Sequence, residues 1–164
     1  MDDWQERIGA VWEAAAGGLV DDEVIARIDA LAAERDPGDA EALFERAGAR
    51  DSAGRPDEAV PLYRLALERG LDDDRRAQAT IQLASSLRNL GDVEGALELI
   101  SAEHAADPDS PYRDAIAAMH ALALASAGRP ERGLEVAILA LVPHMPRYHR
   151  SMTAYARALG GGDA

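Results

Sequence analysis

The sequence predicts an all-α protein built from repeated helix pairs, and three observations support this fold class. Ala, the strongest helix former, occurs 35 times in 164 residues, whereas aromatic residues make up only 4%. Three glycines, Gly54, Gly91 and Gly128, recur at intervals of 37 residues. Apolar residues on both sides of each glycine are spaced three and four apart, as one buried helix face requires. We therefore expect about nine helices in a repeat architecture.

The first helix pair, residues 2–35, is predicted to be degenerate. Its first helix, over 2–16, has one apolar side formed by Trp4, Ile8, Val11 and Trp12. Its second helix is expected over 21–35. Two alanines of that helix, Ala26 and Ala33, stand 33 residues before Ala59 and Ala66 of the next pair. We expect them to occupy equivalent inner positions.

Three further pairs are predicted over about 40–71, 77–108 and 114–142. Small residues stand seven positions before and five positions after each repeated glycine: Ala47, Ala84, Ala121, Ala59, Ala96 and Gly133. We expect the two helices of each pair to approach closely there. An acidic residue also follows each glycine after three positions, where it interacts favourably with the dipole of the second helix. These residues are Asp57, Glu94 and Glu131.

The second helix of each full repeat has a predicted inner face. The three faces are Ala59, Leu62, Tyr63 and Ala66, then Ala96, Leu99 and Ile100, then Leu134, Ala137, Ile138 and Leu141. A terminal helix over 146–159 is predicted as a cap. Its apolar stripe is expected to dock onto Ile138 and Leu141, and consists of Tyr148, Met152, Tyr155 and Leu159. We expect one domain over 1–159 and a flexible tail over 160–164.

These features resemble the tetratricopeptide repeat, a helix pair of about 34 residues with small residues at fixed places and a closing Pro. The resemblance covers roughly residues 20 to 142. It is best at Leu83-Ala84, Gly91-Asp92, Ala96 and Asp107-Pro108. The segments 42–47 and 81–91 are similar to group 5 of these repeats in bacteria. The resemblance implies a right-handed superhelix in which the first helices of the pairs line a concave groove that binds proteins.

Composition excludes several classes of function. The chain has 17 basic and 30 acidic residues, a net charge of −13, which repels nucleic acid and anionic membranes. All 17 bases are Arg, a usage typical of GC-rich bacterial genomes. No Cys is present, which excludes disulfides and thiol chemistry. The acidic start and the short longest apolar run, Val136 to Val142, favour a soluble cytoplasmic protein without a signal peptide or membrane span.

Neither catalysis nor a cofactor is predicted. The four histidines, His104, His120, His144 and His149, form no metal-binding motif, and we expect surface positions with His120 half-buried and hydrogen-bonded. The acidic runs 21–23 and 72–74 precede helices, where capping and the helix dipole explain them. The chain has neither a phosphate-binding glycine loop nor a nucleophile elbow.

The candidate binding site lies on the helix predicted over 75–90. Its apolar side is expected to consist of Ile81, Ala84, Leu87 and Leu90, with Leu83 beside them. Polar residues recur on another side at spacings of four, three and four: Gln78, Gln82, Ser85 and Asn89. Arg75 extends this polar row and Arg88 borders it. In the resembled fold the row lies on the groove floor, where amides and Arg suit a peptide backbone or a carboxylate. The alternative is a merely solvated helix face.

Repeat proteins that hold a C-terminal carboxylate use basic groove residues. The equivalent positions here are Phe44, Gly48, Gln82, Ala115 and Met119, or, one unit earlier, Glu45, Gln78 and Gln82. None is basic, so a carboxylate clamp is disfavoured. We predict a non-catalytic module that binds a protein segment in its groove.

The alternative is a structural homodimer that associates through the apolar last repeat. Its first helix has Ala115, Ala118, Leu122 and Ala125 where the preceding repeat is polar. Its second helix contains the Val136 to Val142 run. The terminal helix either covers these residues or leaves them exposed to a second copy.

Overall fold

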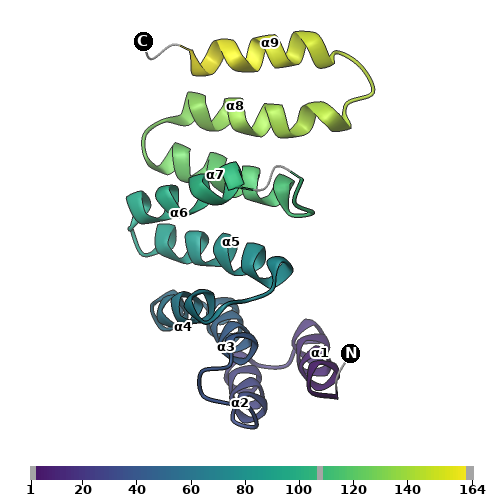
Figure 1. The fold of residues 1–164 in the computed structure, drawn as a ribbon, viewed down its shortest axis with the longest axis vertical. Helices are drawn as coiled ribbons and strands as arrows, with labels where there is room; N and C mark the ends of the chain where they lie inside the picture. Colours follow the sequence, from purple (N-terminus) through teal and green to yellow (C-terminus); the bar gives the residue numbers. More distant parts are fainter. Residues whose placement is uncertain (1–2, 107–108, 162–164) are drawn as a thin grey trace. The chain divides into compact units, whose positions relative to one another are not determined.

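The computed structural model describes residues 3–106 and 109–161, so the predicted closing Asp107-Pro108 and the last three tail residues lie outside the described part. Within it the chain forms nine α-helices, one short 3-10 turn and no strand (Figure 1). The predicted all-α helical repeat is therefore confirmed. Two compact units, Met1–Ser86 and Leu87–Ala164, divide the chain within the fifth helix. The single domain over 1–159 stays a prediction.

The first unit contains four complete helices and most of a fifth. They are α1 (Asp3–Ala16), α2 (Asp21–Ala32), α3 (Ala40–Ser52), α4 (Pro56–Arg69) and α5 (Asp73–Asn89). The second unit contains the end of α5 and the remaining elements. These are α6 (Val93–Ala106), α7 (Arg113–Ser126), α8 (Pro130–Leu141), η1 (Val142–His144) and α9 (His149–Gly160). Within each unit, helices that follow one another in sequence pack together in several pairs, among them α3 with α4 and α7 with α8.

The repeated glycines end the first helix of each full repeat in the same way. Gly54, Gly91 and Gly128 have φ angles of 71°, 88° and 75°, the left-handed conformation that glycine adopts without steric cost. The amide after each glycine donates to a carbonyl five residues earlier, as in a Schellman cap. These bonds join Arg55 to Arg50, Asp92 to Leu87 and Arg129 to Leu124, each at 2.9 Å. The 37-residue period is thus a structural repeat.

Small residues allow close helix contacts at the predicted positions. Ala47, Ala59, Ala84 and Ala96 are completely buried. At Gly133 of α8, an added methyl carbon would lie only 2.6 Å from the Ala121 carbonyl oxygen of α7. The glycine therefore sets the distance between these two helices.

Two of the predicted helix starts differ in how they are capped. Asp72 accepts a hydrogen bond from the Arg75 amide at 2.8 Å at the start of α5, so capping is confirmed there. At α2 the cap residue is Val20, which makes no side-chain hydrogen bond. The acids 21–23 lie inside the first turn instead, where the helix dipole still favours them.

The predicted inner face of α2 is wrong. Ala26 and Ala33 are exposed, and Ala33 lies just beyond the helix end. The buried residues are Val24, Ile25, Ile28, Leu31 and Ala32. Ile25 and Ala32 precede Ala59 and Ala66 by 34 residues, so the true offset is one residue longer than predicted. A one-residue shift turns a helix by about 100°, which moves the alanines out to solvent.

The apolar side predicted for α5 is partly wrong. Ala84, Leu87 and Leu83 are buried as expected, whereas Ile81 is half-buried and Leu90 is 48% exposed beyond the helix end. Buried Ala77 and Thr80 complete the actual face, together with Ala79 and Ser86. The large apolar residues alone do not mark this face, because close helix packing buries small side chains such as Ala77 and Ser86 as well.

The inner face predicted for α8 is partly wrong, since Ala137 and Ile138 are half-buried but the two leucines are exposed. Leu134 and Leu141 are 50% and 56% exposed, and Gly133 is the one fully buried residue in this helix. The reason is that α8 lies between α7 and α9, which pack on opposite sides of it (Figure 1).

The terminal helix packs on α8 through a different face from the one predicted. Tyr148 and Tyr155 are 72% and 67% exposed, whereas Ala156 and Gly160 are buried. Arg132 of α8 donates to the Gly160 carbonyl at 3.1 Å, and an added methyl at Gly160 would lie 2.7 Å from the same guanidinium. Small residues thus bring α9 close, and of its predicted apolar stripe only Met152 is half-buried, whereas Tyr148, Tyr155 and Leu159 are exposed.

Candidate functional site

A polar pocket of about 370 Å³ lies in the first unit where the first helices of successive pairs meet. Its walls come from α1, α3 and α5, with one residue reaching in from α4. The lining residues are Trp12, Phe44, Glu45, Gly48, Asp51, Ser52, Tyr63, Gln78 and Gln82. We call this site the α1–α3–α5 pocket. It combines aromatic rings, two carboxylates and two side-chain amides, which is the mixture of groups typical of a binding site.

The carboxylate of Glu45 is held by an indole. Trp12 Nε1 donates to Glu45 Oε2 at 2.7 Å, which joins α1 to α3. Burial raises the pKa of the Glu45 carboxyl above its ordinary value, and the Trp12 hydrogen bond opposes this only in part. Among the described residues, the other carboxylate oxygen, Oε1, accepts no hydrogen bond.

A second set of hydrogen bonds orients the amide of Gln82. Tyr63, completely buried on α4, donates from its hydroxyl to Gln82 Oε1 at 2.7 Å. Burial, followed by the charge of Asp51, raises the pKa of the Tyr63 hydroxyl, so it stays protonated and able to donate. Asp51 itself accepts from Ser86 Oγ at 2.7 Å. Gln82 lines the pocket, and its amide nitrogen donates no hydrogen bond among the described residues, so this donor is left for a ligand.

The structure brings two of the six predicted site residues into the pocket, namely Gln78 and Gln82. Gln78 donates to Asp74 Oδ2 at 2.9 Å, which leaves its oxygen to accept. Arg75 is half-buried and engaged in ion pairs, at 2.8 Å with Asp72 and 3.6 Å with Glu41. Ser85 is half-buried but does not line the pocket.

The other two predicted residues belong to the second unit. Arg88 Nη2 lies 3.5 Å from Asn89 Oδ1, and Arg88 Nε is buried without a hydrogen-bond partner among the described residues. Asn89 is exposed at the end of α5. The predicted polar row is thus divided between the two units, and only Gln78 and Gln82 line the α1–α3–α5 pocket.

No binding role was predicted for the rest of the pocket. Trp12 was placed on the apolar side of its helix, although it is only half-buried. Phe44, Glu45 and Gly48 had been compared with carboxylate-clamp positions and set aside as non-basic. Five of the positions aligned with the clamp, Phe44, Glu45, Gly48, Gln78 and Gln82, line the pocket, whereas Ala115 and Met119 do not.

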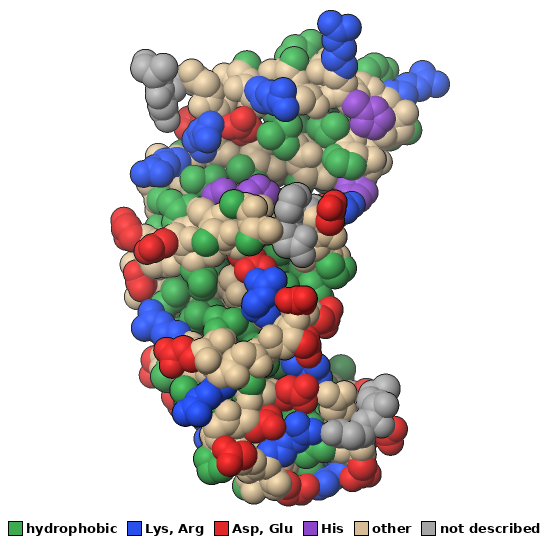
Figure 2. Space-filling view, viewed as in Figure 1, with side chains coloured by type: hydrophobic (Ala, Val, Ile, Leu, Met, Phe, Trp, Pro, Cys, Tyr) green, Lys and Arg blue, Asp and Glu red, His purple; other side chains and the backbone are tan. Residues whose placement is uncertain are grey.

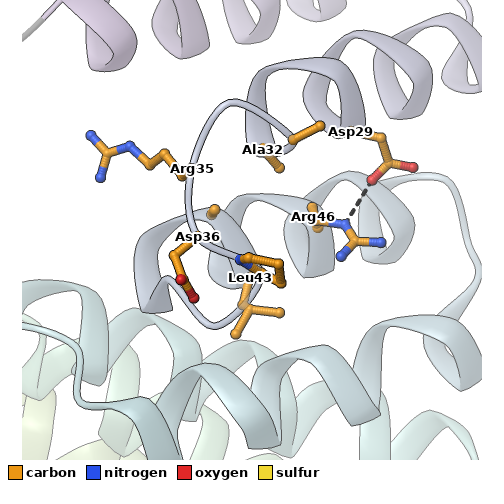
Figure 3. Close-up of a pocket in the computed structure, with 9 residues that line it drawn as sticks. Asp29, Ala32, Arg35, Asp36, Leu43 and Arg46 are labelled. Atoms are coloured by element: carbon orange, nitrogen blue, oxygen red, sulfur yellow. Dashed lines mark hydrogen bonds and ion pairs between the residues drawn. The ribbon is translucent and has the colours of Figure 1, made fainter.

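A second pocket of the first unit lies between α2 and α3 (Figure 3) and has a volume of about 380 Å³. Figure 3 shows Asp29 of α2 paired with Arg46 of α3, at 2.9 Å, whereas Arg35 points away from this pair. Arg50 also pairs with Asp29, at 2.8 Å. The charged groups satisfy one another, so this pocket contains an internal ion pair that joins two helices.

In the second unit, a more apolar pocket of about 300 Å³ lies between α7 and α8, with His104 of α6 beside it. His144 contacts Asp114 at 3.0 Å. His120 is half-buried and shares a hydrogen bond of 3.1 Å with Ser101, as predicted. Among the described residues, no group of three or more His, Asp or Glu could hold a metal ion. None of the described helices has the length and apolar character that crossing a membrane requires.

Large apolar side chains are exposed on three consecutive helices of the second unit. They are Leu122 on α7, Leu134 and Leu141 on α8, and Tyr148, Tyr155 and Leu159 at α9. Tyr155 and Leu159 are four residues apart and share one side of α9. We call these six residues the α7–α9 apolar surface.

The chain is a helical repeat protein, because its helix pairs have glycine turns at a fixed period and small residues where the two helices of a pair contact each other. A family model described as Tetratrico peptide repeat, that of group 5, matches residues 40–159. The chain therefore belongs to the tetratricopeptide repeat family, and the resemblance seen in the sequence is confirmed. No curated protein matches the chain. Membership of this family suggests a protein-interaction module and is typical of non-catalytic proteins.

Proposed function

We propose that this protein is a non-catalytic adaptor that binds an extended segment of a partner protein in the α1–α3–α5 pocket. The observation that carries the proposal is the pocket itself, where the first helices of three pairs present polar groups together. The net charge of −13 further favours a protein partner over nucleic acid.

The two amides supply complementary chemistry for a peptide backbone. Gln82 presents its nitrogen because Tyr63 occupies its oxygen. Gln78 presents its oxygen because Asp74 occupies its nitrogen. A peptide unit has one donor and one acceptor, so a segment lying across α5 can satisfy both amides. The fixed orientation of Gln82 lowers the entropy cost of binding.

The test uses peptides selected from a random display library against the whole chain, with affinity then measured by fluorescence anisotropy. The double variant Gln78→Ala and Gln82→Ala should weaken binding roughly tenfold or more, because each lost hydrogen bond costs about 0.5–1.5 kcal/mol. The matched control is Arg64→Ala, an exposed residue of α4 that does not line the pocket. It should leave the affinity unchanged. Equal affinities for wild type and the double variant would overturn the proposal.

A second candidate function is self-association through the α7–α9 apolar surface. It is favoured by the exposure of Tyr148, Tyr155 and Leu141, each more than half exposed. Fully burying a large apolar side chain contributes about 1.5–3 kcal/mol, so joint burial of several of these six residues against a second copy would favour a dimer. Light scattering should then give twice the 17.5 kDa monomer mass, and Tyr155→Ser with Leu159→Ser should restore the monomer. A monomer mass for the wild-type chain at about 100 μM, well above the Kd of a stable dimer, excludes this candidate.

A further inference from the structure

The α1–α3–α5 pocket has acidic walls without a basic residue to neutralise them. Glu45 and Asp51 line it, and no Arg or His appears among its described lining residues. Arg75 lies near enough to lower the pKa of Glu45, but its guanidinium is already paired with Asp72 and Glu41. Residues 1–86 as a whole contain 10 Arg and 20 acidic residues, and red side chains are frequent over this unit in Figure 2. An entering cation would therefore meet a favourable potential.

Glu45 has the geometry of a cation acceptor. Trp12 fixes Oε2, so the direction of the carboxylate is set before a ligand arrives. Oε1 accepts no hydrogen bond among the described residues. A half-buried carboxylate with one unused oxygen gains more from a charged donor than an exposed carboxylate does.

An aromatic wall accompanies this carboxylate. Trp12 is half-buried, so part of its ring system remains accessible at the pocket. Phe44 and Tyr63 also line the pocket, with their ring centroids 6.2 Å apart. A guanidinium group can stack flat on an indole while its edge donates to a carboxylate, a combination that the compact ammonium of Lys matches less well.

We propose that the pocket binds the side chain of an arginine in the partner segment, with its guanidinium on Glu45 Oε1 and against Trp12. This inference rests on the proposed function and specifies the chemistry of the partner. The pocket's charge pattern is opposite to that of a carboxylate clamp, because the acidic Glu45 and Asp51 line the pocket and no basic residue appears among its described lining residues. The partner segment is thus basic rather than acidic at its anchoring residue.

The experiment follows the indole N–H signals of the full chain by proton–nitrogen correlation NMR during titration. The chain has two tryptophans, so each signal can be assigned. Trp4 donates to the Leu31 carbonyl at 2.8 Å outside the pocket and serves as the internal reference. The probes are N-acetyl-arginine amide and its neutral isostere, N-acetyl-citrulline amide. Arginine should shift the Trp12 signal in the millimolar range, and citrulline should bind at least roughly tenfold more weakly.

Two matched variants identify the carboxylate responsible. Glu45→Gln should abolish the response to arginine, whereas Glu68→Gln, the same charge change at an exposed α4 position, should preserve it. The Trp4 signal reports whether each variant is folded. Equal responses to arginine and citrulline, or no Trp12 response in the wild type, would overturn the arginine inference. The display-selected peptides test the pocket independently of the arginine inference. If those peptides still bind in the pocket but arginine and citrulline bind equally well, only the arginine inference is refuted and the proposed function stands.

Discussion

At the residue scale, Asp29 shows how single charges hold neighbouring helices of the first unit together. It lies on α2 and accepts hydrogen bonds from Arg50 and Arg46 of α3. Burial opposes its ionisation, but the hydrogen bonds from Arg50 and then Arg46 outweigh burial and lower the pKa of Asp29 below its ordinary value of 3.8. The side chain remains 34% exposed, so solvent weakens the pair.

Asp29→Asn should destabilise the chain by about 0.5–1.5 kcal/mol at pH 7, measured by urea unfolding. Because the pKa of Asp29 is lowered in the folded state, its contribution is present above the pKa of the unfolded chain and is lost as pH falls through the folded pKa. The difference between wild type and variant should therefore shrink below about pH 4. Glu68→Gln should show no such difference. A difference that persists unchanged at pH 2 would contradict the ion-pair account.

The candidate site could be predicted only in part, for a reason visible at single residues. Gln78 and Gln82 stood out because polar residues recurred at helical spacing on one helix. Trp12 and Glu45 are 33 residues apart and lie on different helices. Their contact depends on how α1 packs beside α3, which periodicity along one helix does not contain. Tyr63 was correctly expected to be buried, but its hydroxyl partner lies on α5.

At the scale of helices, residues that recur at the 37-residue period predicted the helix–helix contacts well. The spacing of large apolar residues predicted the buried faces less well. The glycine turns and the small residues around them were correct, because close approach and left-handed φ each restrict a position to few residue types. The faces of α8 and α9 were partly wrong, because α8 packs against α7 and α9 on opposite sides and α9, at the end of the array, packs on α8 through its small residues Ala156 and Gly160. On α2, a one-residue error in alignment moved the predicted alanines to the exposed side.

Gly133→Ala tests the close approach of α7 and α8. The added methyl carbon would lie 2.6 Å from the Ala121 carbonyl oxygen, so the helices must separate. We expect a loss of about 1–3 kcal/mol in unfolding free energy, measured by urea unfolding. The matched control is Gly9→Ala in α1, where nothing lies within 4 Å of the added methyl. It should stabilise by about 0.5–1 kcal/mol, because Ala favours helix over Gly. Equal stabilisation by both substitutions would show that the contact is not tight.

At the scale of the whole molecule, the chain combines two surfaces of different character. The first unit presents the acidic α1–α3–α5 pocket, and the second exposes the α7–α9 apolar surface. The face drawn in Figure 2 shows several Arg side chains over α9, in contrast to the many acidic groups over the first unit. The net charge of −13 is a sum over the whole chain. It therefore does not show that acidic side chains are frequent in the first unit and that Arg side chains lie over α9.

The central claim is that a partner segment binds in the α1–α3–α5 pocket. Intermolecular NOEs between protons of the peptide and protons of the protein test this claim most directly. The measurement is an isotope-filtered NOE spectrum of the labelled chain with an unlabelled, display-selected peptide. We predict intermolecular NOEs from the peptide to the Trp12 indole and to the side-chain amide of Gln82, and none to the Trp4 indole. NOEs confined to Tyr148, Tyr155 and Leu159, with none at Trp12 or Gln82, would contradict the account and place binding on the α7–α9 apolar surface.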